Sequence, residues 1–560
     1  MQFKKTLVRL LVIFLPLTGL AQATYFPEGD KANILLERIE IKLKNDSAFG
    51  FSKTKPLSRQ NILATIRQWG DTLPPKLDLS KVDRYNLNSL LLNNLEYLPA
   101  NDIYRSRKPI AKRFYRSPAN LYEVHVKDFD LFINPVIQFT VSKEKDNDET
   151  LYLNTRGVSL RGRIANKIGF YAYMTDNQEK DPLWVRDWVT YRKAVPGEGF
   201  YKQFKNTGYD YFDARGYFTF NVTKYIDVSF GFDKNFIGNG YRSLFLGNTS
   251  NSNLFLKLNT RIWKFNYQNL FMELQNADSR IGDKLLGKKY AAMHHLDVAV
   301  TKWLNIGVFE SIIFGRKDHF DFGYLNPVIF YRSIEQQNGS FDNSILGLDL
   351  KANFDRKIQV YGQFSLDEFI LSEIKKNDGY WANKFGMQIG AKYIDAFGIK
   401  NLDLQVEHNR VRPFTYSHND SVANYTHYNQ PLAHPLGANF KEFIGIARYQ
   451  PAPKWLIVGK LIYYQQGRDS SARSFGSNIF LTNQPPFRQG DYGYSIGSGW
   501  KTNVLYGSLL LSYEWKENLF FEASALYRKQ ETKTPPIVSN NTSVITVGVR
   551  WNMHRREFDY

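Results

Sequence analysis

From about Leu131 to the C-terminus, apolar and polar residues alternate along the chain, which is the period of a β-strand. Two neighbouring segments, 214–220 and 226–232, illustrate the pattern, because apolar side chains such as Phe218 alternate with polar ones such as Thr219. Only a short turn separates these segments, so they predict an antiparallel hairpin. Each strand would present one apolar face and one polar face.

Eight such hairpins can be recognised. With a first strand at 131–141 and a last one at 544–553, they predict a sheet of about eighteen antiparallel strands. The paired segments are 151–162 with 168–175, 214–220 with 226–232, 254–259 with 265–271, 296–300 with 304–309, 345–354 with 358–364, 387–394 with 402–407, 443–449 with 455–464, and 505–515 with 519–528.

The connections between these strands are unequal in length. Turns within hairpins are short and loops between hairpins are long, which is typical of transmembrane barrels with short periplasmic turns and long outer loops. Pairing the first strand with the last would leave no open edge in lipid. We therefore predict an all-β transmembrane fold, an outer-membrane β-barrel over 126–560. A soluble propeller or sandwich is the alternative fold.

The first 23 residues have the pattern of a cleaved secretory signal peptide. Lys4, Lys5 and Arg9 form a basic region, residues 10–20 are apolar, and Ala21-Gln22-Ala23 suits a cleavage site. A transmembrane anchor is the alternative, but the apolar stretch is short for one.

Residues 24–125 predict a small helical module and a linker, placed in the periplasm; a disordered spacer is the alternative. Apolar residues recur at helical spacing after Lys31, after Ser58 and after Ser80, and the two serines suit helix N-caps.

Composition narrows the class of protein and its partners. Aromatic residues make up 16% of the chain, with 35 Tyr and 42 Phe, which suits the aromatic girdles of a barrel and also the stacking of sugars. There is no Cys, so a lipoprotein and disulfides are excluded. The net charge is +19, and it stays strongly positive without the three basic signal residues. For an exported chain, lipopolysaccharide or an acidic polysaccharide is the expected counter-charge, and nucleic acid is not.

Signals for catalysis are weak. Asp367 and Glu368 are adjacent on a predicted strand and would face opposite ways, as would His294 and His295. Gly238-Asn239-Gly240 follows a strand, but no helix comes after it to bind a phosphate. We expect a non-enzymatic protein without a cofactor or a metal.

Two long outer loops combine aromatic and basic residues, a pattern that suits an acidic sugar polymer through stacking and charge. The same residues could instead fold inward and plug the barrel. The candidate glycan-binding residues are Trp184, Arg186, Trp188, Tyr191, Arg192, Tyr201, Lys202 and Tyr209 in the first loop, and Tyr416, His418, Tyr425, His427 and Tyr428 in the second.

Charged residues also recur on the strand faces predicted to point into the lumen. They could form a cross-braced interior or line an ion or ligand path. The candidate lumen-facing residues are Arg156, Arg215, Asp227, Asp233, Lys257, Lys351, Asp367, Glu407, Lys460, Arg528 and Arg550.

Several blocks of the sequence begin at Glu28, Lys55, Asn154, Val195, Ile237, Tyr324 and Leu432. Together these blocks resemble a known family, the capsule-assembly Wzi-like outer-membrane proteins of the Bacteroidetes type, which includes proteins labelled gliding-motility protein RemB. The resemblance covers nearly all of the mature chain. It implies an eighteen-stranded barrel with a helical periplasmic module, and it implies that the barrel anchors capsular polysaccharide at the cell surface.

We therefore predict a barrel that binds and anchors capsular or exopolysaccharide in capsule assembly, with its long loops at the cell surface. One alternative is an accessory outer-membrane protein of gliding motility, with protein partners in the surface or motility machinery. A second alternative is a diffusion porin. A transporter with a globular plug and about 22 strands is disfavoured, because the chain is too short for both.

Overall fold

The computed structural model describes residues 24–44, 48–69, 74, 77–98, 104–276, 285–339, 341–470, 473–534 and 536–560. The predicted signal peptide, residues 1–23, lies outside the described residues. Within the described part of the chain, no helix is long and apolar enough to cross a membrane.

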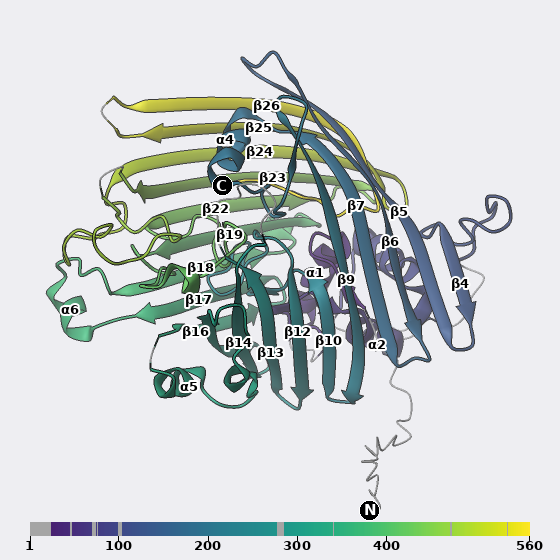
Figure 1. Cartoon of the computed structure of the whole chain (residues 1–560). Helices are drawn as coiled ribbons and strands as arrows, with labels where there is room; N and C mark the ends of the chain where they lie inside the picture. The colour runs from purple at the N-terminus through teal and green to yellow at the C-terminus, as the bar shows by residue number, and fades with distance from the viewer. Residues whose placement is uncertain are drawn as a thin grey trace, which may run out of the picture.

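A closed antiparallel β-barrel dominates the structure (Figure 1). Its sheet joins twenty strands among the described residues. Two of them are short: β4 (Tyr122–Val126) pairs only with β5, and β8 (Lys202–Phe204) pairs only with β9. The other eighteen strands form the wall of the barrel. The eighteen are β5 (Phe129–Glu144), β6 (Thr150–Ile164), β7 (Ile168–Lys180), β9 (Gly208–Thr223), β10 (Ile226–Asp233), β12 (Asn253–Ile262), β13 (Phe265–Gln275), β14 (Lys288–Ala299), β15 (Leu304–Phe314), β16 (Asn343–Phe354), β17 (Ile358–Glu368), β18 (Lys384–Tyr393), β19 (Leu402–Val411), β22 (Phe440–Tyr449), β23 (Trp455–Arg468), β24 (Trp500–Lys516), β25 (Leu519–Thr532) and β26 (Val538–Trp551).

The last strand closes the barrel by pairing with the first. Val547 on β26 lies opposite Val141 on β5, and the ladder runs from Val544 to Trp551. This pairing gives every edge strand a partner, as a barrel in lipid requires. The predicted all-β barrel of about eighteen strands is confirmed.

The two ends of the barrel differ. Hairpin turns such as 165–167 and 355–357 lie at one end, which we call the short-turn end. Most connections at the other, the long-loop end, are much longer and carry helices α4 (Leu183–Arg192), α5 (Tyr331–Gln337) and α6 (Leu371–Lys376). Two connections at that end, 145–149 and 533–537, are short, contrary to the expected pattern.

In the described part of the chain before the barrel there are three α-helices, α1 (Ala32–Leu43), α2 (Arg59–Trp69) and α3 (Lys81–Leu92), and a 3-10 helix, η1 (Leu95–Tyr97). Ser80 caps α3 as predicted, because its hydroxyl accepts a hydrogen bond from the backbone N–H of Asp83 and the Asp83 carboxylate accepts one from Ser80 N–H. The helices share a small core around Leu36, Ile39 and Ile62. We call residues 24–98 the helical module.

The helical module sits against the inner wall of the barrel and closes its short-turn end (Figure 1). Strand β2 (Thr54–Lys55) of the module even pairs with β11 (Phe236–Ile237), which belongs to the loop between β10 and β12. That loop therefore reaches from the long-loop end down to the module. Short strands β1 (Tyr25–Phe26) and β3 (Leu57–Ser58) pair within the module, and β20 (Thr426–His427) and β21 (Gln430–Pro431) pair within a long loop.

Candidate functional site

The loop between β7 and β9, residues 181–207, carries the first set of candidate residues. At the end of α4, Tyr191 is exposed and its ring centre lies 4.9 Å from the Arg192 guanidinium. The same guanidinium lies 4.2 Å from the ring centre of Phe480 in another long loop. Lys202 is also exposed in this loop. The long-loop end therefore offers accessible rings beside cationic groups.

Two tryptophans of α4 pack against the C-terminal segment inside the barrel. Trp184 and Trp188 both pack on Phe558, with ring centres 4.6 and 5.4 Å away. The guanidinium of Arg528 lies 4.5 Å from the ring centre of Trp184. These two tryptophans hold the helix in place, so their rings are not free to stack on a sugar.

Three further candidates of this loop also make contacts within the protein. Arg186 donates a hydrogen bond to Glu149, at 2.6 Å. The rings of Tyr201 and Tyr209 meet edge to face, 5.0 Å apart, and Tyr209 is buried. Tyr201 is half-buried. Of the eight candidates in this loop, Tyr191 and Lys202 are the exposed ones.

All five candidates of the loop 412–439 are buried, namely Tyr416, His418, Tyr425, His427 and Tyr428. The loop folds into the barrel, as the alternative interpretation proposed. Tyr416 donates a hydrogen bond to Leu244 O at 2.8 Å, and Tyr425 donates one to Phe245 O at 2.7 Å. Burial lowers the pKa of His427 to about 4, so its imidazole is neutral at neutral pH. In this structure these side chains support the inner loop and do not reach the surface.

Of the eleven residues predicted to face the lumen, ten lie on the inner side of the wall and one does not. Arg156 is 61% exposed and pairs with Asp176 on the outer side of the wall. Its neighbour Thr155 is fully buried, and Arg161, in phase with Thr155, donates to Asn93 O in the helical module. The odd-numbered side chains of β6 therefore point into the barrel, and the prediction that Arg156 faces the lumen is wrong.

The remaining lumen-facing residues take part in internal networks. Glu407 accepts hydrogen bonds from the backbone N–H groups of Tyr241 and Arg242, at 2.7 and 3.1 Å, and from the Tyr361 hydroxyl at 2.8 Å. Eight of the others also contact interior groups: Arg215 with Asp213, Asp233 with Lys234 N, Lys257 with Asn235, Lys351 with Glu40, Asp367 with Tyr416 N, Lys460 with Asp559, Arg528 with Tyr464, and Arg550 with Glu522. Asp227 lies in the electrostatic field of Arg261 and Lys257.

Ion pairs tie the helical module to the wall. Lys53 pairs with Asp297 on β14, at 3.0 Å, and with Asp349 on β16. Arg38 of α1 binds Asp83 of α3 and, on the barrel side, Asp395 at 2.8 Å. Because these charges are almost all buried, each needs the other as a partner.

The C-terminal tail, residues 552–560, was not anticipated from the sequence. It leaves β26 and runs back through the barrel to α4, where Figure 1 shows the C-terminus. Asp559 accepts hydrogen bonds from Arg242 at 2.8 Å and from Lys460 at 2.7 Å. The alternation of acidic and aromatic residues in Glu557-Phe558-Asp559-Tyr560 is the one signal that could have suggested such a partner.

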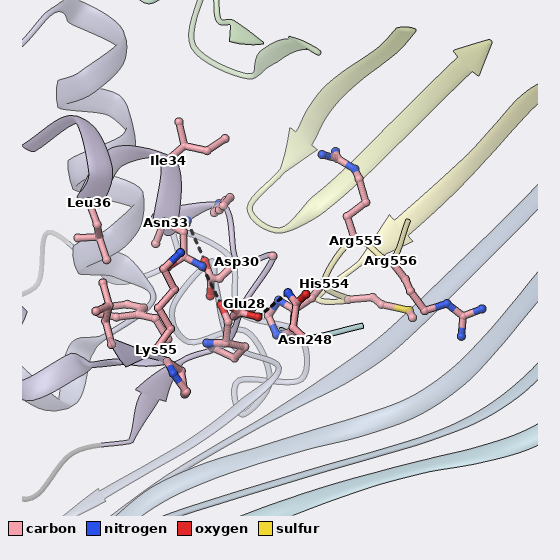
Figure 2. A pocket seen from close by; sticks show the side chains of 18 of the residues that line it. Glu28, Asp30, Asn33, Ile34, Leu36, Lys55, Asn248, His554, Arg555 and Arg556 are labelled. Atoms are coloured by element: carbon pink, nitrogen blue, oxygen red, sulfur yellow. Dashed lines mark hydrogen bonds between the residues drawn. The ribbon is translucent and has the colours of Figure 1, made fainter. Parts of the chain in front are cut away.

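A cavity of about 630 Å³ lies between the helical module, the wall and this tail. Figure 2 shows Glu28 and Asn248 joined by a hydrogen bond of 2.5 Å, with Lys55 and the tail residue His554 close by. The lining carries charges of both signs, such as Glu37 and Arg215, together with apolar side chains such as Leu36. Among the described residues, no group of three or more His, Cys, Asp or Glu side chains could hold a metal ion.

Comparison with known proteins places the chain in a family. A model of the capsule assembly protein Wzi family matches residues 198–521, which is more than half of the chain. The chain belongs to this family. The resemblance seen in the sequence is thereby confirmed, and the barrel is an outer-membrane barrel of the Wzi type. No curated protein sequence matches the chain.

One solved structure of a Wzi protein shares the fold of this chain. The outer-membrane protein Wzi of Escherichia coli is 12% identical, with a TM-score of 0.56, over 95% of this chain and 100% of that one. That protein is involved in group 1 capsule assembly and is a carbohydrate-binding β-barrel. OprD of Pseudomonas aeruginosa is 11% identical with a TM-score of 0.39, over 76% of this chain and 94% of that one. OccAB2 of Acinetobacter baumannii is 9% identical with a TM-score of 0.41, over 75% and 98%.

Proposed function

We propose that this Wzi-family protein binds capsular or exopolysaccharide and holds it at the cell surface, without enzymatic activity. The observation that carries the proposal is the family match over 198–521. The likeness of the barrel to a carbohydrate-binding barrel of the same family supports it.

The proposed orientation places the short-turn end and the helical module in the periplasm and the long loops outside the cell. The asymmetry of the connections supports this, because outer-membrane barrels have short periplasmic turns. The proposed domains are a signal peptide at 1–23, the module and its linker at 24–125, and the barrel at 126–560.

The proposed glycan-binding surface is the exposed part of the loop 181–207. Tyr191 offers an exposed ring for stacking on a sugar, and exposed Lys202 offers positive charge for an acidic polymer. Half-buried Arg192 adds positive charge beside the Tyr191 ring. The net charge of +19 adds a general attraction for polyanions. The buried tyrosines and histidines of the loop 412–439 hold the inner loop in place in this proposal.

The filled interior favours a binding protein over a diffusion porin. The helical module occupies the short-turn end, and the loop 234–252 lies buried across the lumen with Leu244 and Phe245 at its centre. A porin needs a continuous aqueous path. Large conductance steps from the intact protein in a planar bilayer would favour the porin alternative.

The direct test is binding. The purified barrel in nanodiscs should retain the acidic polysaccharide of its own species, and added salt should weaken the binding because the charges are exposed. Neutral dextran is the control polymer. Failure to bind the acidic polymer even at low salt would overturn the proposal.

A further inference from the structure

The loop between β15 and β16 departs from the other long loops described above. We call its described residues, 315–339 and 341–342, the flap; they include a short 3-10 helix, η3 (Phe322–Leu325), and α5. In Figure 1, α5 lies outside the ring of strands, beside β14 and β16. The flap therefore folds down the outer wall, whereas the loops 234–252 and 412–439 fold inward.

The alternation of residues on β15 identifies the surface that the flap covers. Ile306 and Val308 face outward and are 41% and 42% exposed, as lipid-facing residues are. Ile312 and Phe314 belong to the same face, farther toward the long-loop end, yet they are fully buried. Their cover comes from the flap residues Tyr324 and Tyr331, which are themselves fully buried in one cluster with them.

The covered wall contains polar side chains that are unusual on a lipid-facing surface. His294 on β14 lies opposite Glu310 on β15, both on the outward face, and both are buried. The flap supplies their partners: the backbone N–H of Arg332 donates to Glu310 at 3.1 Å, and the ring of Tyr331 lies 4.0 Å from that of His294. Without the flap, these groups would have only each other as a polar partner, at 3.9 Å, with hydrocarbon around them.

The flap is braced at its base. Arg316, at its start, donates two hydrogen bonds to Asp342, at its end, with distances of 2.7 and 2.6 Å. Tyr324 donates a third bond to the same carboxylate, at 2.6 Å. On the wall, the Tyr267 hydroxyl donates to Pro327 O at 2.6 Å. The flap is therefore held on the wall at both its base and its middle.

The outer side of the flap is strongly apolar. Phe322, Val328 and Phe330 are 80%, 83% and 65% exposed. Exposed apolar patches of this kind are rare on protein surfaces that face water. These side chains sit on a wall whose uncovered neighbours, such as Val308 and Leu348, also expose apolar side chains outward.

We propose that the flap is a membrane-embedded element whose outer side, defined by Phe322, Val328 and Phe330, lies among the acyl chains of the membrane leaflet nearest the long-loop end. There the flap replaces the strand surface as the contact with lipid. It lets the wall keep the polar pair of His294 and Glu310 away from hydrocarbon. The occupant of this surface is lipid, and contact with a second copy of the chain is the competing outcome.

Because the chain has no cysteine, single-cysteine labelling tests the proposal cleanly. Val328→Cys places a spin label on the outer side of the flap. Leu348→Cys, on the lipid-facing side of β16, is the lipid reference, and Asn206→Cys, in an exposed turn of a long loop, is the water reference. Each variant is reconstituted in lipid vesicles, and the collision rates of the label with oxygen and with a water-soluble nickel chelate are compared.

The label at position 328 should give an oxygen-to-nickel ratio close to that at 348 and severalfold above that at 206. A ratio like that at 206 would overturn the proposal. Spin–spin broadening between labels at 328 that disappears on dilution with unlabelled protein would also overturn it, in favour of a second copy. Phe322→Cys repeats the test if Val328→Cys does not fold.

Discussion

Lys351 on β16 donates a hydrogen bond to Glu40 on α1, with 2.5 Å between Nζ and Oε1, and both side chains are almost fully buried. One residue belongs to the barrel wall and the other to the helical module. The pair is therefore a direct energetic link between the two parts, together with the contacts of Lys53 and Arg38.

Breaking this link should release the module. Lys351→Met leaves the Glu40 carboxylate buried without its cation, and losing one partner of such a pair costs about 3–5 kcal/mol. We expect trypsin to cleave the module of this variant much faster than that of the wild type. Lys376→Met is the control, because Lys376 is exposed and solvent screens its pair with Glu373.

The double variant Lys351→Met/Glu40→Leu removes both charges and should recover most of the protection. If Lys351→Met alone remains as resistant to trypsin as the wild type, the link does not hold the module.

Acid should loosen the module through Glu37 of α1. Burial alone would raise the pKa of Glu37, but Arg448 and Lys392 outweigh it and lower the pKa from 4.5 to about 2. A carboxyl whose pKa is lower in the folded state stabilises that state above about pH 4.5, and this stabilisation is lost as the pH falls toward about 2. The thermal midpoint should fall across this window, and it should fall less in Glu37→Gln. Parallel curves for the two proteins would contradict the assignment.

The exposed rings and cations of the loop 181–207 should determine affinity for the polymer. Tyr191→Ala removes one stacking ring and should weaken binding up to about tenfold, since such contacts contribute about 0.5–1.5 kcal/mol. Lys202→Ala should weaken it less and reduce its dependence on salt. Tyr225→Ala, an exposed tyrosine in a turn of the short-turn end, is the matched control and should bind normally. Equal effects at Tyr191 and Tyr225 would argue against this surface.

The C-terminal tail should contribute to stability through Asp559. Asp559→Asn leaves the Arg242 and Lys460 cations buried with weaker partners, and we expect a loss of about 3 kcal/mol or more in the free energy of unfolding. Glu557→Gln is the control, because Glu557 also pairs with Lys460 but is exposed. Urea titrations in detergent measure both, and a loss in Glu557→Gln as large as that in Asp559→Asn would contradict the role of the tail.

The strands and helices were predictable because their signals are local. The period of two, the short turns and the caps lie within a few residues of one another, so segments such as 214–232 and the Ser80 cap could be assigned from the chain alone. The family resemblance added the expected function.

The placement of loops and polar residues was less predictable. Tyr416 and Tyr425 donate hydrogen bonds inside the barrel, yet the same residue types would suit a sugar at the surface. The Arg156 side chain was predicted to face the lumen because it is polar. Buried Thr155 and the contact of Arg161 with the helical module show instead that the odd-numbered side chains of β6 face inward. These contacts join residues that are 68 to 180 positions apart, and no local pattern encodes them.

Anchoring of polysaccharide by this protein can be measured by deleting the gene and comparing the polymer on the cell with the polymer shed into the medium. With synthesis unchanged, we expect the polymer to move to the medium and to return to the cell with the wild-type gene, but less with Tyr191→Ala/Lys202→Ala. If the polymer stays on the cells without the protein, anchoring is wrong, and gliding motility and conductance are the functions to test.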